Sequence, residues 1–264
     1  MREHISRTGS TEDRDVGGDY AVKTDGLTKR FGDTTAVGRI NIRIPKGEVY
    51  GFLGPNGAGK TTTMRMLTGL TRPTDGSAEV AGVSVADRSE LAPRIGYAPD
   101  TPPLYEQLTG WEQIRLAADV YGVDDDETDT EQYLARFDML EDAHSRISGY
   151  SKGMRQKINV IQAVIHSPEV LFLDEPTGGL DPRAANKMEE LLSELSEAGT
   201  TIFLSTHILE VAERAADRVG LLHEGELLTQ ESPEELVADV GESEDSGLNE
   251  VFLKLTQERR GDTE

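Results

Sequence analysis

The chain has 264 residues, enough for one large domain or two small ones, and its 49 acidic and 27 basic side chains give a formal net charge of −22. The absence of cysteine excludes disulfides and thiolate metal sites, and the acidic balance argues against nucleic-acid binding, which needs a basic face. No apolar run reaches the roughly 20 residues that a membrane-spanning helix needs, and the N-terminus has no signal-peptide pattern, so we expect a soluble intracellular protein.

Residues 1–19 are polar and are expected to form a disordered tail. The segment from about 20 to 98 is rich in β-type patterns, including an apolar strand at 48–53. A helical pattern that contains Met64, Leu67 and Leu70 follows this strand.

Between this strand and this helix lies the sequence GPNGAGKT, residues 54–61, which matches the phosphate-loop pattern G-x-x-x-x-G-K-[ST]. Its glycines let backbone N–H groups turn inward around phosphate oxygens, and the helix N-terminus adds its dipole. Lys60 is expected to reach the β- and γ-phosphates, and the Thr61 hydroxyl to bind Mg²⁺. The predicted nucleotide-binding residues of this loop are Gly54, Pro55, Asn56, Gly57, Ala58, Gly59, Lys60, Thr61 and Thr62.

The pattern turns helical between about 100 and 155. Thr109 and Glu112 form a capping-box sequence that begins one helix. The acidic run DDDETDTE at 124–131 is expected to be a solvated loop, and the next helix carries Tyr133, Leu134 and Phe137.

A second apolar strand, VLFLDE at 170–175, ends in two acids. Asp174 at its end is expected to hold Mg²⁺, and Glu175 to act as the general base that polarises an attacking water. The alternative is that both acids are simply solvated. Strands and helices then alternate to about 229, as in a doubly wound core, before a short helix that begins at Ser232 and a flexible joint at 241–247.

Two windows of 26 residues, 49–74 and 143–168, contain no acid although the chain is strongly acidic. Buried strands and helices avoid carboxylates and account for part of this pattern. Both windows nevertheless carry cations of the exposed type, among them Arg65 and Lys152, so we hypothesise that both face polyanionic phosphate. The remaining acids are spread along the chain, which favours a halophilic protein over a protein with one acidic partner-binding surface.

The motifs GPNGAGKTT, YSKGMRQK, VLFLDEPTGGLDP and TTIFLSTH occur in the order and at the spacings of ATP-binding cassette (ABC) ATPases. The chain resembles this family from about 20 to 229, and the SKGMRQK form and the closing LNEVFLKLT resemble the ATPase subunits of export systems. The resemblance implies an α/β fold with a P-loop NTPase core, in which a mixed sheet is flanked by helices. An antiparallel β subdomain and a helical insert at about 100–155 that carries the signature motif complete the domain, and residues 230–264 form a short C-terminal helical extension.

In this family two subunits pair head to tail, so the resemblance implies a homodimer formed around two ATP molecules. Ser151 and Gly153 match the positions that touch the γ-phosphate of the opposite subunit. The residues themselves also indicate that Ser151 caps a helix whose free N–H groups favour an anion, although a basic surface helix is an alternative. Lys152 and Met154 depart from the common signature, and Lys152 either adds a cation near phosphate or points to solvent.

The resemblance places four further residues. His207 matches the switch histidine that contacts the γ-phosphate, and Phe31 matches the aromatic residue that stacks on adenine, with an ordinary core aromatic as the alternative. Asp100 stands where the family has a Gln and is expected to contact Mg²⁺ or its waters. Asp181 is retained in the loop after the catalytic strand, where Gly178 replaces a frequent Ser.

The expected function is that of an ATP-binding and ATP-hydrolysing subunit with ATP and Mg²⁺ as cofactors. It would power a separately encoded integral membrane permease, and would lie in the cytoplasm, peripheral on the inner face of the cell membrane. The helical insert offers Pro102, Pro103, Leu104, Tyr105 and Trp111 as a groove for this partner or as local core. The alternatives are a soluble ABC ATPase that acts in translation or DNA repair, and a cassette that binds ATP without hydrolysing it.

Overall fold

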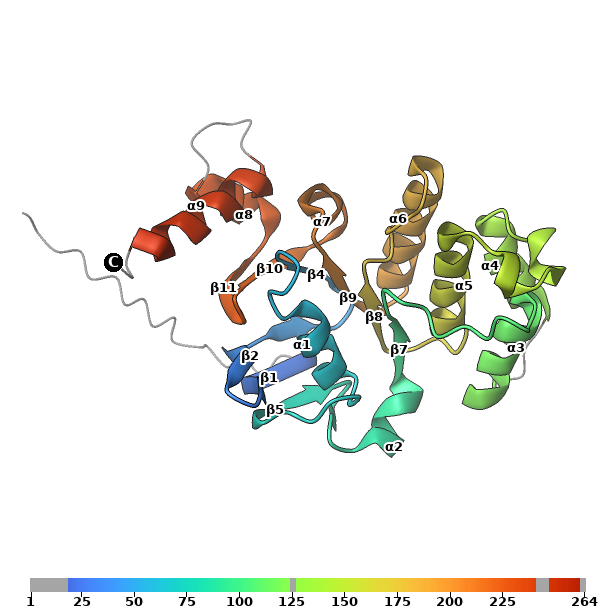
Figure 1. The fold of residues 1–264 in the computed structure, drawn as a ribbon, viewed down its shortest axis with the longest axis horizontal. Helices are drawn as coiled ribbons and strands as arrows, with labels where there is room; N and C mark the ends of the chain where they lie inside the picture. Colours follow the sequence, from blue (N-terminus) through green and yellow to red (C-terminus); the bar gives the residue numbers. More distant parts are fainter. Residues whose placement is uncertain (1–18, 124–126, 241–246, 262–264) are drawn as a thin grey trace, which may run out of the picture.

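The computed structural model describes residues 19–123, 127–240 and 247–261 (Figure 1). Nearly all of the predicted tail at 1–19 and of the predicted joint at 241–247 lies outside these residues. Within the described part of the chain, no helix combines the length and the apolar character that crossing a bilayer requires.

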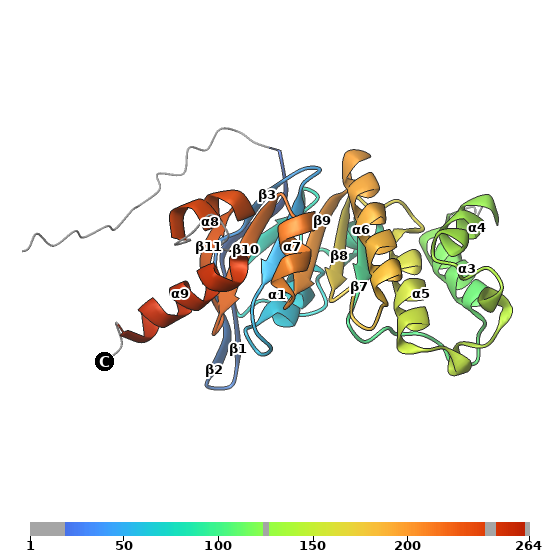
Figure 2. The same cartoon turned by 90° about the horizontal axis from the view of Figure 1, so that it is seen from above.

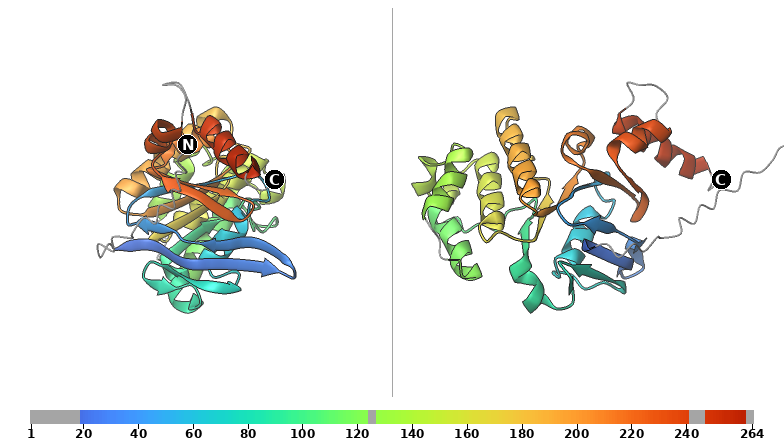
Figure 3. Two further views of the ribbon diagram at one scale, coloured as in Figure 1. Left: turned by 90° about the vertical axis from the view of Figure 1, so that its left-hand side faces the viewer. Right: turned by 180° about the vertical axis from the view of Figure 1, so that it is seen from behind.

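An antiparallel sheet forms the first part of the fold. The long strand β1 pairs with β2 on one side and with β5 on the other, while β3 also pairs with β1. The end-on view in Figure 3 (left) shows β1 and β2, in blue, as long strands alongside the second sheet. The strands are β1 (Tyr20–Phe31), β2 (Thr34–Ile40), β3 (Arg43–Pro45), β5 (Asp75–Val80) and β6 (Val83–Ser84).

The second sheet is mixed and has the strand order β11-β10-β4-β9-β8-β7. Strands β10, β4, β9, β8 and β7 run parallel, and β11 pairs antiparallel with β10. Each residue of β4, β8 and β9 is buried, which explains the apolar runs VYGFL, VLFL and IFL in these strands. The strands are β4 (Val49–Leu53), β7 (Ile95–Ala98), β8 (Val170–Asp174), β9 (Thr201–Thr206), β10 (Arg218–His223) and β11 (Glu226–Glu231).

The two faces of the mixed sheet pack against different layers. On one face, Phe52, Phe172 and Phe203 pack with α1 (Lys60–Leu67) and the antiparallel sheet. On the other face, Leu171, Leu173, Ile202 and Leu204 pack with α5 (Lys152–Val164) and α6 (Pro182–Glu197). These two cores and both sheets confirm the predicted P-loop NTPase fold with its antiparallel β subdomain.

The helical segment lies at one end of the molecule (Figure 2). Its helix α3 begins at the predicted capping box, in which Thr109 accepts a hydrogen bond from the Glu112 N–H and the Glu112 carboxylate accepts one from the Thr109 N–H. The described elements of this segment are α3 (Gly110–Tyr121), α4 (Glu127–Arg136) and the 3₁₀ turns η2 (Asp142–His144) and η3 (Ile147–Gly149).

Two local predictions were wrong. The acidic run at 124–131 was predicted as a loop, but α4 begins at Glu127, because acids are favourable in the first turn of a helix; residues 124–126 are not described. Leu70 was predicted on the helix after the phosphate loop, but α1 ends at Leu67 and Leu70 is exposed.

Further helices complete the described part of the fold. Ser232 caps α8 as predicted, because its hydroxyl accepts a hydrogen bond from the Glu235 N–H. On α9, Leu248 and Val251 pack against Leu209 and Ala212 of α7, and α8 and α9 lie at the end of the molecule opposite α3 and α4 (Figures 1 and 2). These elements are α2 (Arg88–Leu91), η1 (Ala92–Arg94), α7 (Leu209–Ala215), α8 (Pro233–Val240) and α9 (Leu248–Gly261).

Candidate active site

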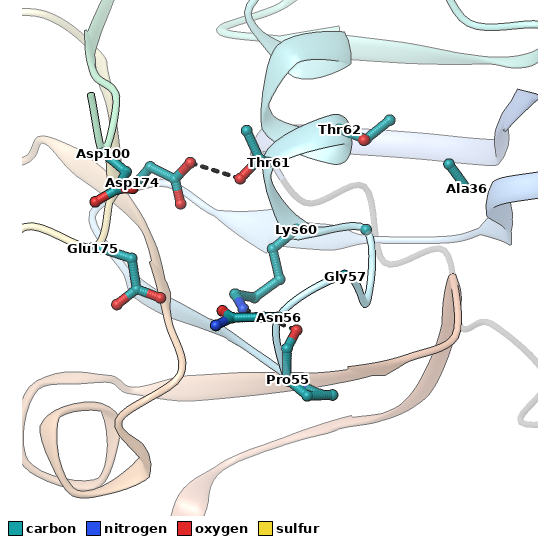
Figure 4. Close-up of a pocket in the computed structure, with 11 residues that line it drawn as sticks. Ala36, Pro55, Asn56, Gly57, Lys60, Thr61, Thr62, Asp100, Asp174 and Glu175 are labelled. Carbon is teal, nitrogen blue, oxygen red and sulfur yellow. Dashed lines mark hydrogen bonds between the residues drawn. The ribbon is translucent and has the colours of Figure 1, made fainter. Parts of the chain in front are cut away.

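Three neighbouring parallel strands end at one edge of the mixed sheet and place the predicted site residues there. In the register of the sheet, Asp174 of β8 lies opposite Ser205 of β9, and Thr206 lies opposite Leu53 of β4. The phosphate loop, the two acids and His207 therefore follow strand ends that lie side by side. The phosphate loop and the two acids border a pocket of about 220 Å³ (Figure 4), whereas His207 is outside its described lining and reaches it through Glu175. The pocket is lined by Ala36, Pro55, Asn56, Gly57, Gly59, Lys60, Thr61, Thr62, Asp100, Asp174 and Glu175.

The backbone of the phosphate loop depends on glycine. Gly59 has a φ of 111°, and a Cβ atom there would lie 2.5 Å from the Ala36 carbonyl oxygen. Gly57 has a φ of 85°, which side-chain-bearing residues rarely adopt. The loop leads directly into α1, whose first turn contains no acid, so this end of the helix suits an anion.

Lys60 supplies a buried cation at the pocket. Its side chain is 7% exposed, and Nζ donates hydrogen bonds to the carbonyl oxygens of Gly54 at 2.6 Å and Pro55 at 3.3 Å. Burial lowers the pKa of Lys60, while the carboxylates of Glu175 and Asp174 act in the opposite direction. An ammonium group held at the pocket by two backbone carbonyl oxygens can bind phosphate oxygens as a point charge.

Thr61 and Asp174 form a pair of oxygen ligands at the base of the pocket. The Thr61 hydroxyl donates to Asp174 Oδ2 at 2.9 Å (Figure 4). Burial raises the pKa of Asp174, the hydrogen bond from Thr61 lowers it, and the nearby carboxylates of Glu175 and Asp100 raise it. A cation at this point would relieve the cost of the buried negative charge.

The oxygen atoms of Thr61, Asp174 and Asp100 are better suited to Mg²⁺ that is shared with a substrate phosphate than to a metal ion bound by protein side chains alone. The described residues contain no group of three or more His, Cys, Asp or Glu side chains that could hold a metal ion. Mg²⁺ is usually bound by one or two carboxylates together with substrate phosphates. One buried carboxylate, one hydroxyl and the Asp100 carboxylate beside a phosphate loop match that pattern.

Glu175 lies in the pocket in a strained backbone conformation. Its φ of 53° lies in the left-handed region, which residues other than glycine rarely adopt. Glu175 Oε1 lies 2.7 Å from His207 Nδ1, and Glu175 Oε2 accepts a hydrogen bond from the Thr206 hydroxyl at 3.1 Å. The structure thus brings Glu175 and His207 into direct contact, in the arrangement of a base and a group that orients it.

The signature residues lie at the start of α5, next to the loop that follows Glu175. Ser151 caps α5, as predicted, by accepting a hydrogen bond from the Met154 N–H. Neither Ser151 nor Gly153 is among the described residues that line the pocket. The Lys152 side chain does not extend freely, because a Cβ atom on Gly179 would lie 2.9 Å from Lys152 Cδ. Lys152 therefore packs across the loop that follows Glu175.

Helix α5 also contacts two backbone segments that contribute residues to the pocket. Its Asn159 side chain donates to the Pro99 carbonyl oxygen at 2.8 Å, next to Asp100. Its Gln156 side chain lies 3.5 Å from the Glu175 carbonyl oxygen. The same helix thus carries the signature motif and supports two segments of the pocket.

Phe31 and Asp181 are outside the described lining of the pocket. Phe31 is 56% exposed at the end of β1, so it is not the core aromatic of the alternative interpretation. Asp181 caps α6 by accepting a hydrogen bond from the Ala184 N–H, which lowers the pKa of Asp181. The sequence reasoning missed Ala36 in the pocket, because Ala36 lies in no motif that it used. It also missed Thr206 beside Glu175, because the motif TTIFLSTH, which contains Thr206, was used only to place His207.

The fold and the pocket together define a P-loop ATPase. Residues 37–178, more than half of the chain, match the model of the family described as ABC transporter. The chain belongs to this family, and it is an ATP-binding and ATP-hydrolysing subunit.

Three comparisons illustrate the relationship. The chain is 40% identical over 220 residues to the bacitracin transport ATP-binding protein BcrA of Enterococcus faecalis, which covers 83% of this chain and 71% of that protein. It is 38% identical over 222 residues to a fluoroquinolones export ATP-binding protein of Mycobacterium tuberculosis, covering 83% and 73%. A dimeric structure of the ATP-binding cassette MJ0796 in a post-hydrolysis state with ADP and Pi has a TM-score of 0.74 and 26% identity, covering 80% of this chain and 98% of that one.

Proposed function

We propose that this ATPase powers export through a separately encoded integral membrane permease, and that it works on the inner face of the cell membrane. The observation that carries the proposal is that Lys60, the Thr61–Asp174 pair and Glu175 line one pocket, with His207 in contact with Glu175. The printed names of two relatives, which describe bacitracin transport and fluoroquinolone export, support the choice of export.

The residues of the pocket divide the chemistry among them. Lys60 and the loop N–H groups hold the terminal phosphates, and Phe31 offers an exposed ring for adenine. Thr61, Asp174 and Asp100 would hold Mg²⁺, which offsets negative charge on the phosphates when bound. Glu175 accepts the proton of the attacking water, and His207, in contact with Glu175 Oε1, helps to orient that water.

Two copies of the chain complete the site. Ser151 and Gly153 lie at the N-terminus of α5 and are not among the described residues that line their own pocket. A head-to-tail homodimer around two ATP molecules would place them, with Asp181 nearby, against the nucleotide of the partner. The dimeric relative supports this arrangement, and acids in either window would repel the bound phosphates.

A soluble ABC ATPase acting in translation or DNA repair is the rival function. The two functions differ in what the chain binds, because the permease must be an integral membrane protein. The candidate docking surface is the helical segment, where Tyr105 is 60% and Val120 is 74% exposed. On α3, Leu116 lies one turn before Val120 and is also exposed, and a contiguous apolar patch indicates a protein interaction site.

The proposal is tested by purifying the tagged chain at high salt from membranes of cells that encode it. We expect a polypeptide with several membrane spans to co-purify, and Tyr105→Asp to reduce its recovery at least severalfold because an apolar contact is replaced by a charge. Leu253→Asp, a change of another exposed apolar residue at the opposite end of the molecule, is the matched control. Recovery of the wild-type chain only with ribosomes or DNA would contradict the proposal.

A further inference from the structure

The hydroxyl of Thr206 is buried beside the catalytic carboxylate, and both of its hydrogen-bonding functions are used. Thr206 is 0% exposed. Its Oγ1 donates to Glu175 Oε2 at 3.1 Å and accepts a hydrogen bond from the Ile208 N–H at 3.1 Å. We infer that Thr206 is a positioning residue that fixes the Glu175 carboxylate for hydrolysis.

The register of the sheet explains why Thr206 can reach Glu175. Asp174 pairs with Ser205 across β8 and β9, so the next residue of each strand lies at the same edge. The Glu175 N–H also donates to the Ser205 carbonyl oxygen at 2.9 Å, which ties the two chain segments together. Because Thr206 also pairs with Leu53, directly before the phosphate loop, its place relative to Lys60 is set by the central sheet.

The direction of the hydrogen bond follows from its surroundings. The Ile208 N–H can only donate, so it occupies an acceptor site of the Thr206 oxygen. The single hydroxyl proton is then directed at Glu175 Oε2, which accepts it. A β-branched side chain within a strand has few accessible rotamers, so the hydroxyl is held in this orientation.

The second partner of the Glu175 carboxylate is less constrained. The His207 side chain is 53% exposed, whereas that of Glu175 is 14% exposed. An exposed side chain can move when nucleotide enters, but the buried Thr206 cannot. Thr206 therefore keeps Glu175 Oε2 in place and leaves Glu175 Oε1 for His207 or for the attacking water. This inference rests on the proposed role of Glu175 as the general base.

The test compares Thr206→Val, which preserves the shape but removes the hydroxyl, with Thr206→Ser, which keeps it. We expect Thr206→Val to lower kcat roughly ten- to a hundredfold, as for the loss of one hydrogen bond to a charged group, with KM for ATP changed less than about twofold. Thr206→Ser should retain most of kcat. Equal losses in both variants, or a loss confined to KM, would overturn the inference.

A double-mutant cycle separates positioning of Glu175 from a general structural effect. In single-turnover hydrolysis, Thr206→Val should slow the wild type but have almost no further effect in a Glu175→Gln background. The same fold-loss in both backgrounds would show that Thr206 acts independently of Glu175 and would overturn the inference. Rapid turnover by Glu175→Gln alone would instead overturn the proposed role of Glu175, and this inference with it. Thermal unfolding and ATP binding of each variant verify that the loss of rate does not come from unfolding.

Discussion

At the scale of single residues, Glu175 is held by several independent constraints. Its left-handed backbone, its contacts with Thr206 and His207, and its position next to the buried Asp174 are all set by strand ends. Such strain persists where the surrounding structure over-determines it, and it is concentrated at functional sites. The geometry therefore supports Glu175, rather than a solvated acid, as the general base.

Glu175→Gln removes the proton acceptor but preserves the size of the side chain. We expect ATP binding to be retained and hydrolysis to fall by two to four orders of magnitude, in line with the loss of a general base. Steady-state phosphate release and nucleotide titration measure the two effects. Glu79→Gln, at an exposed carboxylate on β5, is the control, and a turnover of Glu175→Gln near that of the control would remove Glu175 from its role.

At the scale of elements, short motifs predicted the strands, loops and helix ends that depend on neighbouring residues in the sequence. The buried strands β4, β8 and β9, the phosphate loop and the helix caps at Thr109 and Ser151 follow from apolar runs, glycines and capping residues a few positions apart. The start of α4 within an acidic run was missed because charge alone does not distinguish a loop from a first helical turn.

Contacts between segments that are distant in the sequence could not be predicted. Thr206 and Glu175 are 31 residues apart, and their hydrogen bond depends on the order of strands in the sheet. The position of Lys152 could not be predicted either. The sequence allowed its side chain to lie near phosphate or to point to solvent, and in the structure it packs across Gly179. Asp100 was placed by resemblance, and the structure brings it to the pocket beside Asp174. The domain boundaries stay a prediction.

At the scale of the whole molecule, the charge distribution has consequences for both stability and assembly. A net charge of −22 repels itself in dilute buffer. The surface ion pairs that the structure describes, such as Arg94–Glu169, are too exposed to offset this repulsion by much. The halophilic character of the chain therefore remains a proposal that salt dependence can test.

We expect the folded protein to require high salt. At about 1 M salt the screening length is roughly 3 Å, so repulsion between surface carboxylates is largely removed. Dialysis from molar KCl into dilute buffer should abolish the near-ultraviolet circular dichroism of the folded core, and returning the salt should restore it. Full thermal stability in dilute buffer would contradict the halophilic proposal.

The windows 49–74 and 143–168 contain no acid, and only the first contributes to the described lining of the pocket. We therefore propose that the second window closes over the triphosphate bound by another copy of the chain. The chain contains no cysteine, so a disulfide between copies can be introduced without background. Its formation needs Cα atoms within about 7 Å. Ser151→Cys on one copy and Asn56→Cys, in the phosphate loop of the other, place one thiol in each window.

The most direct measurement mixes these two variants, both in the Glu175→Gln background, with ATP and Mg²⁺ under mild oxidation. A covalent dimer that forms only in the mixture and only with nucleotide is the predicted result on a non-reducing gel, whereas each variant alone should stay monomeric. A mixture that stays monomeric while both variants still bind ATP would contradict the account.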